Sequence, residues 1–382
     1  MDSFSKKRAQ YENTTAAAYN SQVQTEKTMA TLRGFESVFD SLLFDQKVSR
    51  ELYDRQIDLI TTKLSVHMRK YARLLKKLHK LDRMTFADLK ISVDPEYDPK
   101  VTIEGSKEYI EKGLSILGPE YVDMVREAYR DRWVDFAKNQ GKSTGGFCAS
   151  PYGTNSFILL SWNDRMADVF TLAHEMGHSI HTWYSNKNQS YTYSGYKIFV
   201  AEVASTFNEA LLIRHLLKNS KDKQEKAYLL NYFLESFRGT LFRQTMFAEF
   251  EQKAHEMAAA GESMTSQSLC NIYKKLNEDY FGPDTVIDPE IQYEWERIPH
   301  FYTPFYVYQY ATGFSAAIAI SRKIFNGEPG ILEGYKKFLS GGCSDTPIEL
   351  LKLAGVDLSH TGPVEEALKF FEELLNEFEE LA

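Results

Sequence analysis

Residues 174–178 read His-Glu-Met-Gly-His, inside the longer run DVFTLAHEMGHSIH of residues 168–181, and this stretch decides the fold. On a helix, His174 and His178 lie one turn apart on one face, so both imidazoles can bind a single metal ion. Glu175 lies beside them, within reach of a metal-bound water. Two neutral nitrogen ligands and a carboxylate base are the minimal set for metal-assisted hydrolysis. The pattern also occurs by chance, so the surrounding sequence must show whether it is a metal site.

Those surroundings predict a buried helix. Asn163 or Asp164 is available as the N-cap. Gly177 costs a helix interior about 1 kcal/mol relative to alanine, which indicates that another segment packs closely against it. The apolar residues that predict the buried face are Met166, Val169, Phe170, Leu172 and Ala173. The helical context that the motif requires is therefore present.

Composition and charge restrict the class of protein. The chain has 382 residues, 43% hydrophobic and 26% charged, and a formal net charge of -8, which argues against a nucleic-acid binder. It has no run of 18 apolar residues and no signal-peptide core near Met1, and Cys148, Cys270 and Cys343 are isolated in sequence. We expect a soluble cytoplasmic protein without a membrane or nucleic-acid partner, as a monomer or weak homo-oligomer.

Most of the chain has helical periodicity. Helices are predicted over residues 2–83, 106–136, 224–259, 266–280, 348 onward and 363–381, with a kink at Gly239 and a stop at Gly261. Residues 66–83 present a basic face, which we interpret as a solvated helix surface rather than a polyanion site, because no other basic cluster joins it. The fold is predicted to be mainly α.

A short strand is predicted over residues 157–162, after a glycine-rich loop at 141–155, and it forms the only expected sheet. An extended peptide could pair with an open edge of this strand beside the metal helix. Phe157 and Gly146 are the candidate substrate-binding residues here. The alternative, that this strand has only a structural role, has similar weight to the peptide-binding interpretation.

A third metal ligand is predicted on the next helix, which begins near Lys197 after a loop over residues 183–196. Glu202 lies 24 residues after His178, amid apolar neighbours where a carboxylate is costly unless it is paired or metal-bound. Glu209 shares its face two turns on, too far to join the same ion, and we assign it to support a ligand histidine. His181 is excluded as a ligand by its distance along the helix, and we place it in the same supporting shell. The alternative is that Glu202 is an ordinary salt-bridge partner.

Four tyrosines and a histidine occur within residues 300–310. A helix begun by Pro304 would place Tyr306 and Tyr310 one turn apart, so that their hydroxyls converge. His300, Tyr306 and Tyr310 are candidate donors to the oxygen that becomes negative during amide hydrolysis, and Tyr302 is a candidate substrate contact. The alternative is an aromatic core stripe.

Three segments together resemble one family. His174–His178, the segment Ala201-Glu-Val-Ala-Ser-Thr-Phe-Asn-Glu209, and Arg297-Ile-Pro-His-Phe-Tyr302 with the tyrosines after it are similar to the oligoendopeptidase F branch of the thimet oligopeptidase (M3) family of zinc metallopeptidases. The resemblance implies a zincin-type helical fold with one small sheet beside the active-site helix, a deep substrate channel, and cleavage of internal bonds in short peptides.

The resemblance also assigns roles to residues. It implies one Zn²⁺ per chain on His174, His178 and Glu202, with Glu175 as the base on a zinc-bound water, and backbone flexibility at Gly313. Residues 1–105 would be the helical remainder of an N-terminal lobe that is largely missing, and residues 106–382 the zinc-containing catalytic domain. Two alternatives stay open: a zinc exopeptidase of carboxypeptidase type on a similar scaffold, and an inactive peptide-binding fragment.

Overall fold

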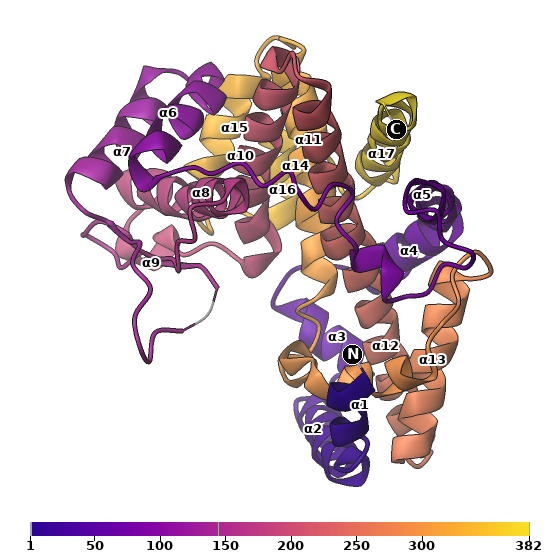
Figure 1. Cartoon of the computed structure of the whole chain (residues 1–382). Coiled ribbons are helices and arrows are strands. Elements are labelled where there is room, and N and C mark those ends of the chain that lie inside the picture. The colour runs from indigo at the N-terminus through magenta and orange to yellow at the C-terminus, as the bar shows by residue number, and fades with distance from the viewer. Residues whose placement is uncertain (1, 144, 382) are drawn as a thin grey trace.

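The computed structural model describes residues 2–143 and 145–381, and its architecture is mainly helical (Figure 1). The α-helices are α1 (Asp2–Arg8), α2 (Glu12–Leu32), α3 (Val38–Phe44), α4 (Arg50–Leu59), α5 (Ser65–Leu78), α6 (Ile103–Gly113), α7 (Pro119–Arg130), α8 (Met166–Asn188), α9 (Tyr191–Ser194), α10 (Ile198–Asn219), α11 (Lys223–Ser236), α12 (Arg243–Ala260), α13 (Ser266–Phe281), α14 (Tyr308–Phe325), α15 (Ile331–Leu339), α16 (Pro347–Leu353) and α17 (Gly362–Leu381). Two π-helical segments, Ile60–Leu64 and Phe237–Phe242, join α4 to α5 and α11 to α12. Short 3₁₀ segments lie at Asp88–Lys90, Ser115–Leu117, Pro289–Arg297 and Pro299–Tyr302.

The core is built on α10, which packs between α8 and α14. Gly177 of α8 permits the first contact, because a Cβ there would lie 2.5 Å from the carbonyl oxygen of Ala204 and 2.6 Å from the Cα of Ser205. Gly313 of α14 permits the second, because its Cβ would lie 3.0 Å from the Cβ of Glu202. The close packing predicted for Gly177 is confirmed. Gly313 is buried inside a helix, so its visible role is packing rather than the backbone flexibility that we expected.

One small sheet lies beside α8, as predicted. Its strands are β1 (Val134–Asp135), β2 (Phe147–Ala149) and β3 (Phe157–Leu159), in the order β1-β3-β2. β3 pairs with β1 in parallel through Val134 and Ile158, and with β2 antiparallel through Cys148 and Ile158. The expected open edge on residues 157–162 is therefore wrong, because β3 is the central strand and the outer strand that contacts α8 is β2.

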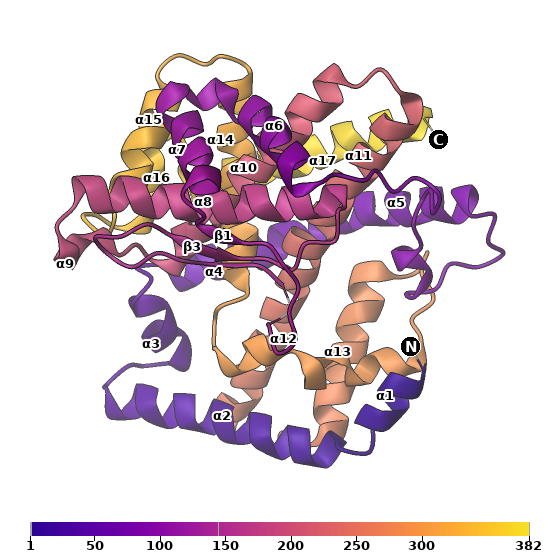
Figure 2. The same cartoon turned by 60° about the vertical axis from the view of Figure 1, so that its left-hand side comes forward.

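The N-terminal helices do not form a separate layer. α1 and α2 lie beside α12 and α13, on the opposite side of the molecule from α6 and α7 (Figure 2). Helices from both sides of the predicted boundary at residue 105 thus pack together, and residue 105 itself lies within α6. The division into 1–105 and 106–382 stays a prediction.

Most helix predictions are confirmed. The long segment over residues 224–259 is interrupted at its π-helical turn, which contains Gly239, and ends at Gly261 with φ of 74°. The helix predicted over residues 106–136 is interrupted at Ser115–Leu117 and ends at Arg130, before β1.

Three local expectations are wrong. Residues 183–196 are not a loop, because α8 continues to Asn188 with Tyr184 buried and α9 follows. The N-cap of α8 is Arg165, since the carboxylate of Asp168 reaches back and accepts hydrogen bonds from the backbone N–H groups of Asn163 and Arg165. Pro304 does not begin a helix, because α14 starts at Tyr308.

The basic face over residues 66–83 lies on α5 and the turn after it. Lys70 pairs with Glu379 at 2.7 Å, and Arg73 pairs with Asp284 at 2.6 Å. These ion pairs fit the interpretation of a solvated helix surface. Over the residues that the structure describes, no helix has the length and apolar character needed to cross a membrane.

Candidate metal centre and active site

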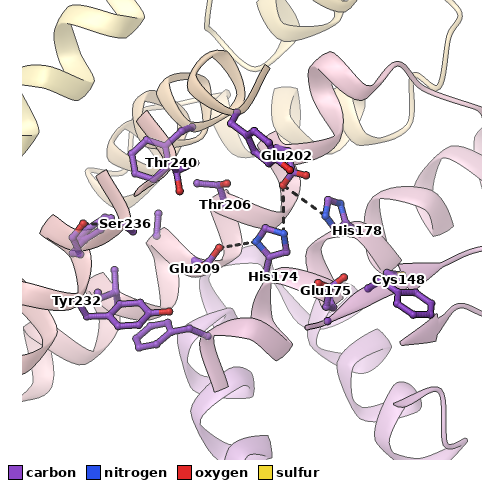
Figure 3. Close-up of a pocket in the computed structure, with 18 of the residues that line it drawn as sticks. Cys148, His174, Glu175, His178, Glu202, Thr206, Glu209, Tyr232, Ser236 and Thr240 are labelled. Atoms are coloured by element: carbon purple, nitrogen blue, oxygen red, sulfur yellow. Dashed lines mark hydrogen bonds and ion pairs between the residues drawn. The ribbon is translucent and has the colours of Figure 1, made fainter. Parts of the chain in front are cut away.

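His174, His178 and Glu202 converge at the contact between α8 and α10 (Figure 3). Oε2 of Glu202 lies 3.3 Å from Nε2 of His174 and 3.8 Å from Nε2 of His178. One ligand atom from each of the three residues lies within 4.8 Å of the other two. The one-turn spacing within α8 and the close helix contact at Gly177 together produce this cluster.

The donor set fits zinc. Ligand atoms on a tetrahedral zinc with bonds of 2.0–2.1 Å lie about 3.3 Å apart, close to the separations between Glu202 and the two histidines. Two imidazoles and one carboxylate are also a set used by catalytic zinc sites, which keep a fourth position for water or substrate. The residues present could therefore hold Zn²⁺ after adjustments of a few tenths of an ångström.

Glu209 orients the first histidine. Its Oε1 lies 2.7 Å from Nδ1 of His174, on the ring edge opposite the nitrogen that faces Glu202. In the tautomer that carries its proton on Nδ1, His174 donates a hydrogen bond to this carboxylate, and its Nε2 lone pair is free to bind a metal ion. Glu209 thus contacts the predicted ligand His174, and its supporting role stays a prediction.

The electrostatics of the cluster favour a cation. Burial lowers the pKa of His174, but hydrogen bonds with Glu202 and Glu209 outweigh it and raise that pKa well above its ordinary value. Burial raises the pKa of Glu202, but its contacts with His174 and His178 dominate and lower it to about 2. Burial lowers the pKa of His178 to about 4, which keeps this imidazole neutral at pH 7. The two carboxylates that stabilise a proton on His174 would equally stabilise a metal ion bound in its place.

Glu175 faces the cavity next to the ligand histidines. Burial raises its pKa to about 7, against the lowering effect of His174. A carboxylate with a pKa near the working pH is suited to accept a proton and then return it. Gly146, which we predicted to be a substrate contact, lines the same cavity, and a Cβ there would lie 3.2 Å from Oε1 of Glu175.

The cluster opens into a cavity of about 420 Å³. Its lining combines polar groups of α8 and α10 with the outer strand β2 and with α11, the π-helical segment and α14. The apolar part of the lining comes from Phe147, Phe170, Ala210, Ile213, Phe233 and Phe314. A cavity of this size, in which polar groups converge beside an apolar wall, is a candidate ligand site.

The histidine and tyrosine cluster is also present. Tyr306 and Tyr310 line the cavity with ring centroids 5.3 Å apart, although Tyr306 lies just before α14 rather than on it. The ring of His300 lies 5.7 Å from that of Tyr306, and its Nε2 is 3.5 Å from the hydroxyl of Tyr310. Burial raises the pKa of both tyrosines, so each hydroxyl keeps its proton and can donate it in a hydrogen bond.

Four predicted residues lie outside the cavity lining: His300, which contacts the two tyrosines that line it, and Phe157, Tyr302 and His181. Phe157 is half exposed on β3, and Tyr302 is exposed and contacts the ring of Tyr19. His181 is buried and stacks on Tyr196 with centroids 3.8 Å apart. Among the described residues no hydrogen bond joins His181 to a predicted ligand, so the structure does not bring it into the supporting shell. The substrate roles of Phe157 and Tyr302 stay predictions.

Sequence reasoning missed one wall of the cavity. Tyr232, Ser236 and Thr240 line it from α11 and the π-helical segment, and Cys148 lines it from β2 (Figure 3). The available signal was a hydroxyl group at every fourth position, 232, 236 and 240, which places the three groups on one helix face. Cys148 has no such signal, because a lone cysteine is equally common in a core.

Comparison with known proteins agrees with this geometry. The sequence model of peptidase family M3 matches residues 1–370. The chain belongs to peptidase family M3. Oligopeptidase PepF of Bacillus subtilis (strain 168) is 45% identical over 382 residues, which are 100% of this chain and 57% of PepF. This M3 chain thus spans little more than half the length of that relative.

Two solved structures extend the comparison. The oligoendopeptidase-F from Enterococcus faecium matches with a TM-score of 0.79 and 35% identity, over 99% of this chain and 61% of that one. A peptidase structure from Chlamydophila abortus matches with a TM-score of 0.89 and 34% identity, over 99% and 63%. The predicted resemblance to the oligoendopeptidase F branch and the predicted helical fold are confirmed.

Proposed function

We propose that this chain is a zinc-dependent endopeptidase that hydrolyses internal bonds of short peptides. The observation that carries the proposal is the convergence of His174, His178 and Glu202 with Glu175 in one cavity. Membership of family M3 supports the reaction class, and similar proteins from Bacillus subtilis and Lactococcus lactis are named as oligopeptidases.

The chain's own residues supply each step apart from the Lewis acid. A bound zinc would polarise the scissile carbonyl and acidify a water molecule. Glu175 accepts the proton of the attacking water and delivers it to the leaving amine. Tyr306 and Tyr310, supported by His300, donate hydrogen bonds to the carbonyl oxygen as it becomes negative.

A strand at the edge of the cavity could bind a peptide substrate in an extended conformation. β2 is one of the two outer strands of the sheet, and it contributes Phe147 and Cys148 to the cavity lining. A substrate backbone that pairs with this strand would be recognised through its amide groups, largely independently of sequence. The strand edge that we expected on residues 157–162 is thus replaced by that of β2.

A short internally quenched peptide, blocked at both ends, tests the proposal. We expect cleavage at internal bonds, mapped by mass spectrometry, that is lost with a chelator and recovered with added zinc. A zinc exopeptidase would leave the blocked peptide intact. Zinc and peptide binding without turnover would identify a binding protein instead.

A further inference from the structure

The segment just before α14 has an unusual backbone. Phe305 has φ of 56°, in the left-handed region that bulky residues rarely adopt. Its side chain is buried against the rings of Phe39, Tyr53 and His255. Phe305 directly precedes Tyr306 in sequence, so the conformation of residue 305 sets the direction in which Tyr306 enters the cavity.

Buried side chains hold the backbone of this segment. Oε1 of Glu251 accepts a hydrogen bond from the N–H of Phe305 at 2.8 Å, and Nε2 of Gln309 donates to the carbonyl oxygen of Phe305 at 3.1 Å. Nε2 of Gln56, on α4, donates to the carbonyl oxygen of Tyr308 at 3.0 Å. Polar contacts from α4, α12 and α14 thus converge on residues 305–308.

Glu251 is the member of this set whose presence most needs an explanation. It lies on α12 with 1% of its surface exposed, and among the described residues it forms no ion pair with a lysine or arginine. Its hydroxylic neighbours are Tyr19 and Tyr53, which carry no compensating positive charge. A carboxyl group in such a place costs free energy, and within the described part of the chain its side chain has one hydrogen bond, the one from Phe305.

We propose that Glu251 is a positioning residue, which holds Phe305 in its left-handed conformation and thereby places the hydroxyl of Tyr306 over the metal cluster. The proposal rests on the proposed function, in which Tyr306 contacts the reacting oxygen. Glu251 itself does not touch the substrate. Burial raises the pKa of Glu251 to about 8, so at pH 7 the group is mainly a neutral acid, and glutamine reproduces its shape and its acceptor oxygen.

Amide hydrogen exchange tests the contact without any need for activity. Glu251→Met keeps the length of the side chain but removes the acceptor, and Glu251→Asp keeps the carboxyl group but shortens its reach. In both variants we expect exchange in peptides spanning residues 303–310 to rise about tenfold, as for the loss of one buried hydrogen bond. Glu251→Gln should exchange like the wild type. If Glu251→Met does not fold, the exchange rate in Glu251→Asp tests the contact on its own.

Tyr273→Phe is the matched control. It deletes one buried hydrogen bond to a carboxylate, that of Glu294, on a different pair of elements. This variant should leave exchange over residues 303–310 unchanged. A rise in exchange there in Tyr273→Phe would indicate general loosening, and would overturn a specific role for Glu251.

Peptide cleavage then tests the positioning. In Glu251→Met we expect kcat to fall about tenfold and KM to stay within about twofold of the wild type, because the Tyr306 contact strengthens only as the oxygen becomes negative. Glu251→Gln should have the kcat of the wild type. Unchanged exchange in the Met and Asp variants, or a Gln variant as impaired as Met, would overturn the proposal. A wild-type chain that binds zinc yet cleaves no peptide contradicts the proposed function instead, and the exchange results still decide the Glu251 contact.

Discussion

Replacement of Gly177 by alanine should separate the two helices that carry the proposed metal ligands. The added Cβ would lie 2.5 Å from the carbonyl oxygen of Ala204 and 2.6 Å from the Cα of Ser205, where ordinary contacts begin at 3.4 Å. Both obstacles are backbone atoms of α10, so rotation of a side chain cannot relieve them. Helix α10 must therefore move away from α8 by somewhat less than about 1 Å at this point, and Glu202 moves with it.

Two effects on stability oppose each other. Overpacking costs about 1–3 kcal/mol, and the helix propensity of alanine returns about 1 kcal/mol. We expect a net loss of about 0–2 kcal/mol in the free energy of unfolding, measured by denaturant titration with a chelator present. The larger effect should be on zinc, because a tetrahedral site tolerates only a few tenths of an ångström of ligand displacement. Its affinity, measured by chelator competition, should fall about 10–100-fold, as for loss of a supporting contact.

Gly239→Ala is the matched control for this experiment. It also adds one methyl group to a helical glycine, but nothing lies within 4 Å of the new Cβ. Zinc affinity should be unchanged in this variant. Wild-type zinc affinity in Gly177→Ala would refute the reasoning, because it would mean that the contact between α8 and α10 does not fix the position of Glu202.

Three further predictions concern single side chains. Glu209→Ala should lower zinc affinity about 10–100-fold in a competition assay, because His174 loses its orienting acceptor, whereas exposed Glu262→Ala should not; equal affinities would contradict the role of Glu209. Tyr306→Phe should lower kcat about 100-fold with little change in KM. Tyr308→Phe should not, because the buried hydroxyl of Tyr308 has no hydrogen-bond partner among the described residues. An unchanged kcat in Tyr306→Phe would contradict the role of Tyr306 as a hydrogen-bond donor. The pKa of Glu251 is about 8 in the folded chain and about 4.3 when unfolded, so the folded state binds more protons between these values and wild-type stability falls as pH rises through them. From pH 6 to 8, Glu251→Gln should therefore gain stability over the wild type by up to about 1.4 kcal/mol per pH unit in urea titrations, and a constant difference would contradict the raised pKa.

The residues of the candidate metal cluster were predictable from the period of a helix and the cost of burying a carboxylate. His174 and His178 are one turn apart, so the sequence determines that they share a face. Glu202 could be inferred because a carboxylate in an apolar helix needs a partner, and Glu209 because it lies on the same face. These inferences need only the period of a helix and the cost of burying charge.

The features that the sequence did not predict depend on tertiary contacts, which the spacing of residues along the chain does not encode. The amino-acid composition of β3 fits an edge strand and a central strand equally well. Only its pairing with β1 and β2 shows that it is the central strand. Residues 183–196 are rich in polar groups and tyrosine, but burial of Tyr184 extends α8 through the first part of them. The contact between Glu251 and Phe305 spans 54 residues and involves a backbone group, which leaves no pattern in the sequence.

The most direct test of the central claim is the zinc content and peptidase activity of Glu175→Gln. This change keeps the size of the side chain and leaves His174, His178 and Glu202 in place, but removes the group that accepts a proton. We predict one zinc per chain and a fall in cleavage of the end-blocked peptide of at least about 100-fold. Undiminished cleavage by a zinc-loaded Glu175→Gln chain would contradict the assignment of Glu175 as the base.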